Sequence, residues 1–163
     1  MNMKDAIVTC FSKYADFSSR ARRSEYWFWV LFNLIVSFAV NIFSSMLGSS
    51  TLSLIVVVAL LIPSISVTVR RLHDIGKSGW YYLLLVVPIV LMFFLLFTYL
   101  FTFDIHYGGS SSILYIMGLL EIASLILAII FIIWLAKDSQ PGMNKYGPNP
   151  KENNFDGMYG GMY

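Results

Sequence analysis

Charged residues are scarce in this sequence of 163 residues: Asp, Glu, Lys and Arg make up 12%, while 58% are hydrophobic and 17% aromatic. A soluble domain carries about 25% charged residues, so too few polar side chains are available to cover a surface that faces water everywhere. Cysteine is nearly absent as well, and the single Cys10 excludes an internal disulfide framework. The composition therefore excludes an ordinary soluble domain and favours a protein partly covered by lipid.

Four long apolar runs are present instead, and each is long enough to form a transmembrane helix. A spanning helix needs roughly 20 mostly apolar residues, and the runs cover residues 26–47, 51–69, 80–103 and 113–136. None contains Lys or Arg. Continuous apolar runs favour helices over the alternating strands of a barrel, although Pro63 and Pro88 are expected to bend the second and third helices. We therefore predict an all-α membrane protein whose four transmembrane helices lie within residues 26–136.

The basic residues are unevenly distributed among the connecting segments. All 11 lie before the first run, between the second and third, or after the fourth: Lys4, Lys13, Arg20, Arg22, Arg23, Arg70, Arg71, Lys77, Lys137, Lys145 and Lys151. In a four-helix arrangement these segments share one side of the membrane, and the two other loops carry no Lys or Arg. Positively charged loops remain in the cytoplasm. We therefore expect both termini to be cytoplasmic.

The two terminal segments differ in character. In residues 1–25, apolar side chains recur at helical spacing and predict an amphipathic N-terminal helix: Met3, Ala6, Ile7, Cys10, Phe11 and Tyr14. With Lys4 and Lys13 nearby, this helix either lies at the cytoplasmic membrane surface or packs on the protein's own cytoplasmic loops. Residues 137–163 form a polar cytoplasmic tail, and we expect its end, residues 155–163, to be mobile.

Three polar motifs, residues 20–27, 70–80 and 142–150, adjoin the apolar runs, and the topology brings them to one cytoplasmic face. Glu25 and Asp74 can pair with Arg22, Arg23, Arg70 or Arg71 and hold the helix ends together, because an unpaired charge near a low-dielectric boundary is costly. Alternatively the face binds anions, since arginine suits phosphate and Ser78 precedes the expected start of a helix. The candidate residues for either role are Arg20, Arg22, Arg23, Glu25, Arg70, Arg71, His73, Asp74, Lys77, Ser78, Asn144 and Tyr146.

Catalytic and metal-binding patterns are weak in this sequence. Lys77 and Ser78 follow a glycine, but the earlier glycine of a phosphate-binding loop is missing, because position 71 is Arg71. His73 and Asp74 have no second ligand cluster, since the only other histidine, His106, is expected on the opposite side of the membrane. We therefore predict no catalytic residue, metal or cofactor, favour a non-enzymatic protein, and expect no nucleic-acid partner.

Glu121 is the only charged residue inside the four apolar runs. A charge within the membrane is by default a functional hypothesis. Glu121 either hydrogen-bonds Asn41 or Ser44 and helps to hold helices together, or it belongs to a proton or ion pathway. Ser37, Asn41 and Ser44 follow helical spacing, so they form a polar stripe on the first predicted helix.

The three polar motifs together resemble a known family. Phe17 with residues 20–27, then residues 70–80, then Gly142, Asn144 and residues 146–150 closely resemble the bacterial Domain of Unknown Function 805 family. The resemblance covers roughly residues 5–150, with Ser19 where that family commonly has glycine. It implies a small multi-pass protein of the bacterial inner membrane, and it implies no established reaction.

Three functional hypotheses remain. The first is a non-enzymatic inner-membrane protein whose cytoplasmic Arg/His/Asp face binds anionic lipid head groups or a partner. The second is a small oligomeric transporter or channel that uses Glu121 and the polar stripe. The third is a membrane enzyme acting on lipid-linked phosphate substrates. The expected partners are the lipid bilayer, anionic lipid head groups, and a second copy or another membrane protein.

Overall fold

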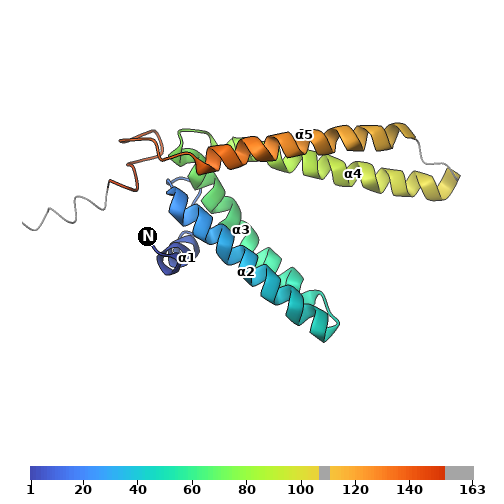
Figure 1. Cartoon of the computed structure of the whole chain (residues 1–163), viewed down its shortest axis with the longest axis horizontal. Coiled ribbons are helices and arrows are strands. Elements are labelled where there is room, and N and C mark those ends of the chain that lie inside the picture. Colours follow the sequence, from blue (N-terminus) through green and yellow to red (C-terminus); the bar gives the residue numbers. More distant parts are fainter. Residues whose placement is uncertain (107–110, 153–163) are drawn as a thin grey trace, which may run out of the picture. The chain divides into compact units, whose positions relative to one another are not determined.

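The computed structural model describes residues 1–106 and 111–152, and every regular element in this part of the chain is a helix. The elements are α1 (Met3–Ser12), α2 (Arg23–Leu47), α3 (Thr51–Asp74), the 3₁₀ helix η1 (Gly79–Tyr82), α4 (Leu83–His106) and α5 (Ser111–Ala136). Figure 1 labels the five α-helices. Within these elements lie four helical segments long and apolar enough to cross a membrane. The predicted all-helical fold with four candidate spans is therefore confirmed for the described residues. The tail end that we expect to be mobile lies outside them.

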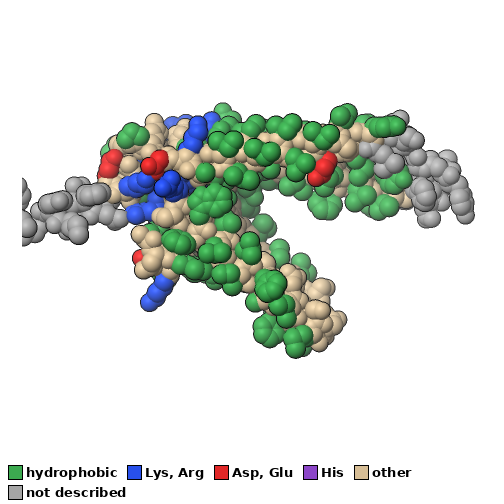
Figure 2. All heavy atoms as spheres, in the orientation of Figure 1, with side chains coloured by type: hydrophobic (Ala, Val, Ile, Leu, Met, Phe, Trp, Pro, Cys, Tyr) green, Lys and Arg blue, Asp and Glu red, His purple; other side chains and the backbone are tan. Residues whose placement is uncertain are grey.

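The chain divides into two compact units, Met1–Gly79 with Ala136–Tyr163, and Trp80–Leu135. The first unit contains α1, α2, α3 and the tail, and the second contains α4 and nearly all of α5. In both units the long helices expose mainly hydrophobic side chains, which suits a surface facing lipid (Figure 2). In the second unit the Tyr81 ring meets the Trp134 ring edge-on at 5.5 Å between centroids.

Helices α2 and α3 form an antiparallel hairpin around a short turn (Figure 1). Gly48 ends α2 with φ +62°, a left-handed conformation that favours glycine, and its N–H donates back to the Ser44 carbonyl. The Ser44 and Ser53 hydroxyls lie 2.7 Å apart across the hairpin. This turn and hydroxyl pair fix the register in which α2 and α3 pack.

Helix α1 packs against α2 and α3. Ala6 and Cys10 are fully buried there. Phe11 meets the rings of Trp29 and Phe32 edge-on, at 5.3 and 6.2 Å between centroids. The contacts of α1 are thus made with the two long helices, whereas one of our two expectations placed it on the loops.

Pro63 explains how the segment after α1 is attached to α3. Proline has no N–H, so the carbonyl four residues earlier, that of Ala59, loses its helical partner. The Tyr14 hydroxyl donates to that carbonyl at 2.7 Å. About one turn after Pro63, the Ser66 hydroxyl donates to the Asp16 carbonyl at 2.7 Å. The proline therefore creates the acceptor by which Tyr14 binds α3.

Helix α3 continues further than the hydropathy of the sequence suggests. We placed residues 70–74 in a polar loop, but they form the last turns of α3, and all five are buried. Likewise the third span does not begin directly as an α-helix, because the four-residue η1 precedes Leu83. Hydropathy ends a run at its first charged residue, whereas the helix continues because its charged side chains find partners.

Candidate functional site

Six charged or titratable side chains are buried where the start of α2 meets the end of α3, and we call them the buried polar cluster. They are Arg20, Glu25, Arg70, Arg71, His73 and Asp74, and none is more than 6% exposed. They come from the segment before α2, the first turn of α2 and the last turns of α3. All six were candidates from the sequence, and the fold brings them together from two of the three polar motifs.

Ion pairs account for most of the charge in this cluster. Arg70 Nη1 lies 2.5 Å from Glu25 Oε1. Arg20 Nε lies 3.1 Å from one oxygen of Asp74, and Arg71 Nη1 binds the other. Removing one member of such a pair leaves an uncompensated buried charge, which typically costs about 3–5 kcal/mol. Three guanidinium groups face two carboxylates, so the cluster carries one positive charge in excess.

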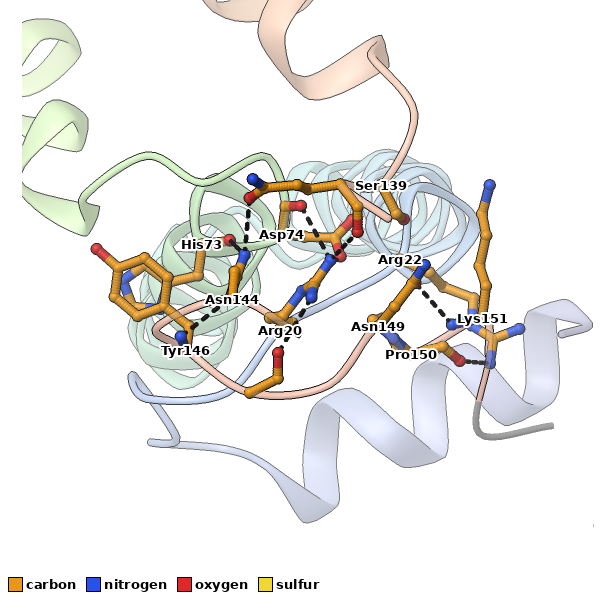
Figure 3. A network of polar contacts seen from close by, with 12 residues as sticks. Arg20, Arg22, His73, Asp74, Ser139, Asn144, Tyr146, Asn149, Pro150 and Lys151 are labelled. Carbon is orange, nitrogen blue, oxygen red and sulfur yellow. Dashed lines mark hydrogen bonds and ion pairs between the residues drawn. The ribbon is translucent and has the colours of Figure 1, made fainter. Parts of the chain in front are cut away.

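Arg20 connects the cluster to the chain after α5. We call residues 137–152 the tail loop. Arg20 Nη1 donates to the carbonyls of Gly142 and Gly147, at 2.8 and 3.1 Å. Arg20 Nη2 donates to the Gln140 carbonyl at 2.6 Å. The planar guanidinium presents its donors in a fixed fork, so one side chain binds three carbonyls of the tail loop and Asp74 together (Figure 3).

Further contacts hold the two ends of the tail loop. Arg71 Nη2 donates to the Lys137 carbonyl. At the other end, Arg22 Nη2 donates to the Pro150 carbonyl at 2.7 Å (Figure 3). Between them, the Gln140 N–H donates to the Asp74 carbonyl at 3.0 Å. Three arginines of the first two polar motifs, Arg20, Arg22 and Arg71, are therefore bound to backbone carbonyls of the tail loop.

His73 is part of the same assembly. Its ring stacks on the Tyr146 ring at 3.6 Å between centroids, with 3° between the planes. Its Nδ1 lies 3.3 Å from the Ser19 carbonyl. Asn144 Nδ2 donates to the His73 carbonyl at 3.0 Å, and Asn144 Oδ1 accepts from the Tyr146 N–H at 2.9 Å. His73 thus supports the tail loop through both its ring and its carbonyl (Figure 3).

The loop after α3 is compact and is bonded to its own helix. The Lys77 N–H donates to the Leu72 carbonyl at 2.9 Å. Gly76 has φ +75°, and a Cβ there would lie 2.7 Å from the Gln140 side-chain oxygen. Ser78, which we considered as the start of an anion-binding helix, precedes the short η1 rather than a long helix. The long helix α4 begins only at Leu83, so Ser78 does not directly precede its first turn.

Cys10 and Arg70 join α1 to the cluster. Cys10 Sγ lies 4.0 Å from Glu25 Oε1. Burial, together with the Glu25 carboxylate, raises the pKa of the Cys10 thiol to about 12. Arg70 Nε and Nη2 are buried without a hydrogen-bond partner in the described part of the chain. A buried N–H without a partner costs about 1–3 kcal/mol, so Arg70 is the least well satisfied member of the cluster.

Other basic side chains of this unit face outward. Lys4, Arg23, Lys137 and Lys145 are exposed, and Lys145 Nζ lies 4.8 Å from the centroid of the Tyr146 ring. Figure 2 shows Lys and Arg side chains gathered near the tail loop. Lys151, by contrast, pairs with Asp138. The hydrogen bond from Lys151, followed by that from the Ser139 N–H, lowers the pKa of the Asp138 carboxyl.

The polar groups expected inside the membrane are divided between the two units of the chain. Glu121 is exposed on α5. Asn41 Nδ2 donates to the Ser37 carbonyl of its own helix at 2.8 Å, and Ser44 bonds Ser53 as described above. At the turn of the hairpin lies an open hollow of about 400 Å³, lined by Asn41, Ser44, Ser45, Gly48, Ser49, Ser50 and Ser53.

The chemistry available to the cluster follows from these contacts. Both oxygens of Asp74 bind arginines, and His73 is stacked and hydrogen-bonded. Among the described residues, no group of three or more His, Cys, Asp or Glu side chains is placed to hold a metal ion. The arrangement binds and orients the tail loop.

Some residues of this assembly were missed from the sequence. Gln140 contributes its N–H, its carbonyl and its side chain, and Asn144 Nδ2 donates to its Oε1 at 3.1 Å. Asn149 is 5% exposed, and its Nδ2 donates to Glu152 at 2.9 Å. Asn149 lies between two prolines, a setting typical of a fixed turn, and that was the available signal. Gln140 gives no such signal, because any residue type except proline could make the same contacts through its backbone N–H and carbonyl.

These features define a helical membrane protein with four candidate spans, in which two membrane helices and the tail are joined by a buried polar cluster. The model of the family described as Protein of unknown function (DUF805) matches residues 14–148, so the chain belongs to that family. The membership expected from the three motifs is confirmed.

Two relatives from Escherichia coli strain K12 are membrane proteins. The chain is 38% identical to inner membrane protein YhaI over 85 residues, which cover 51% of this chain and 72% of the relative. It is 28% identical to inner membrane protein YhaH over 153 residues, which cover 90% of this chain and 97% of the relative. No solved structure matches the chain.

Proposed function

We propose that this protein is a non-enzymatic protein of the bacterial inner membrane whose cytoplasmic surface binds anionic lipid head groups. The observation that supports this is that its basic residues fall into two groups, one buried and one exposed. The arginines of the buried polar cluster are used internally, whereas Lys4, Arg23, Lys137 and Lys145 of the same unit are exposed. Exposed cations beside membrane helices are available to phosphate groups of the adjacent leaflet.

The buried polar cluster supports this role indirectly. By binding the tail loop through Arg20 and Arg71, it keeps Lys137 and Lys145 close to the ends of α2 and α3. Each basic residue close to an anionic membrane surface contributes about 1 kcal/mol of binding. The segregation of Lys and Arg in the sequence supports a cytoplasmic position for this surface, where a leaflet rich in anionic lipid is the available partner.

The test is binding of phosphatidylglycerol to the purified full-length protein in neutral detergent micelles, measured by native mass spectrometry against phosphatidylcholine. We expect preferential retention of phosphatidylglycerol. The triple variant Arg23→Gln, Lys137→Gln, Lys145→Gln should weaken that binding at least tenfold, since about 1 kcal/mol is lost per charge. The matched control is Lys151→Gln, which removes a cation that already pairs with Asp138. Equal retention of both lipids, or no change in the triple variant, would refute the proposal.

Transport is the second candidate, and one observation favours it. Glu121 lies in the span Tyr115–Ala136, is exposed on α5, and has no hydrogen bond or ion pair with the described residues. An exposed carboxyl group at this depth requires a partner or a water-filled path. Vesicles containing the protein should then show proton-coupled flux that Glu121→Gln abolishes. Absence of flux over a broad panel of ions and metabolites would remove this candidate.

A further inference from the structure

Helix α1 contacts the buried polar cluster through Cys10, and the attachment continues from there along the hairpin. Tyr14, just after α1, bonds the Ala59 carbonyl, and Ala59 precedes Arg70 by eleven residues, about 16 Å along the helix at 1.5 Å per residue. Phe11 contacts Phe32, which lies nine residues into α2. Ala59 and Phe32 both belong to candidate spans. Helix α1 therefore lies beside the membrane-facing part of the hairpin.

The surface of α1 is divided into three sides. Ala6 and Cys10 face the hairpin and are fully buried. The second side is apolar and exposed: Val8 is 58% exposed and Phe11 is 44% exposed. Phe17, which follows the helix, is 45% exposed.

The third side of α1 is polar. Asp5 and Ser12 are exposed there. The Thr9 hydroxyl donates to the Asp5 carbonyl at 2.7 Å, and the Ser12 hydroxyl donates to the Thr9 carbonyl at 3.0 Å. These hydroxyl groups are satisfied locally and need no protein partner. An apolar side and a polar side flanking one buried side are what a helix at a lipid–water boundary requires.

We propose that α1 is an interfacial helix embedded in the leaflet at which α2 begins, with Val8, Phe11 and Phe17 among the lipid chains. The occupant of this apolar side is lipid, because the candidate spans against which α1 packs expose apolar side chains as well. Leu31 and Ile35 of α2 are 45% and 50% exposed. Lys4 and Lys13 can extend their ammonium groups toward phosphates while their methylene stems stay in the apolar layer.

This inference does not depend on a preference for anionic head groups, so it is tested in vesicles of phosphatidylcholine alone. Single cysteines for nitroxide labels are introduced into the full chain carrying Cys10→Ala. Val8→Cys and Phe17→Cys report the apolar side, and Asp5→Cys and Ser12→Cys are the matched controls on the polar side. Power saturation compares collisions with oxygen, which partitions into lipid, and with a water-soluble nickel complex.

We expect labels at positions 8 and 17 to have an oxygen-to-nickel collision ratio several-fold higher than labels at positions 5 and 12. High nickel accessibility at all four positions would place α1 in water and overturn the inference. Protection of positions 8 and 17 from both reagents would show that protein covers this side, which would overturn it as well. Circular dichroism of each labelled variant establishes that its helices are retained.

Discussion

Arg20 is the residue on which the tail loop depends most. Its guanidinium binds the Asp74 carboxylate and the carbonyls of Gln140, Gly142 and Gly147 together. These partners lie more than fifty residues away in the chain. From the sequence, Arg20 is one of several interchangeable basic residues of the first motif. Its buried position is what separates it from Arg23, which is exposed three residues later.

Arg20→Lys should therefore release the tail loop although it keeps the charge. An ammonium group cannot reach the three carbonyls and the carboxylate at once, and each lost hydrogen bond to a charged group weakens the structure by about 1.5–3 kcal/mol. Hydrogen exchange at the backbone amides of Gln140, Asn144 and Gly147 should accelerate at least tenfold. Arg23→Lys is the control and should leave the exchange unchanged. Equal protection in both variants would contradict the assigned role of Arg20.

Cys10 offers a direct measure of how firmly α1 is held. Its pKa is raised from 9.0 to about 12, so near pH 8 the native thiolate fraction is about 1000-fold smaller than in the unfolded chain. Alkylation by iodoacetamide should be slow in the native protein and fast after denaturation. The unfolded thiol ionises first as the pH rises, so the thiol's contribution to stability is lost above about pH 9. Rapid alkylation of the native protein would show that α1 is not docked.

At the scale of elements, Pro63 in α3 and the Tyr14 hydroxyl together make one attachment between α3 and the segment after α1. Pro63 removes the N–H that would bind the Ala59 carbonyl, and Tyr14 supplies the replacement donor. The sequence indicates a bend at Pro63 but does not indicate which group occupies the acceptor. That depends on the position of α1, which only packing establishes.

Tyr14→Phe should lower the free energy of unfolding by about 0.5–1.5 kcal/mol, the usual net contribution of a hydrogen bond. In a Pro63→Ala background the alanine N–H can bind Ala59, so the same Tyr14→Phe change should have a smaller effect. The difference is measured as a double-mutant cycle by chemical denaturation in mild detergent. Additive effects of the two substitutions would show that Tyr14 and Pro63 act independently.

The helix boundaries show where reasoning from hydropathy succeeds and where it fails. The apolar runs locate the spans because a run of uncharged residues is a local property. The end of α3 is different: Arg70, Arg71 and Asp74 are helical and fully buried. Their burial depends on Glu25 and Arg20 from another segment, which no local pattern contains.

At the scale of the whole molecule, the segregation of basic residues makes the topology testable. Single cysteines replace Ser49 in the hairpin turn and Met143 in the tail loop, in the Cys10→Ala background. If both termini are cytoplasmic, a membrane-impermeant maleimide should label position 49 in intact spheroplasts and position 143 only after permeabilisation. The reverse pattern would invert the orientation and place the exposed lysines of the tail loop outside the cytoplasm.

By itself, the sequence determined the class of protein, the number of candidate spans, the family and the set of polar residues worth examining, because composition, hydropathy and motif order are carried by the chain locally. Only the tertiary structure decided that Arg20, Arg70 and Arg71 face inward, and that Lys4, Arg23, Lys137 and Lys145 face outward. The sequence does not distinguish the roles of arginines in one motif. Their roles differ only because the fold places a carboxylate or a carbonyl next to some of them. The partners of Arg20 lie up to 127 positions away, and such a distance is bridged by packing alone.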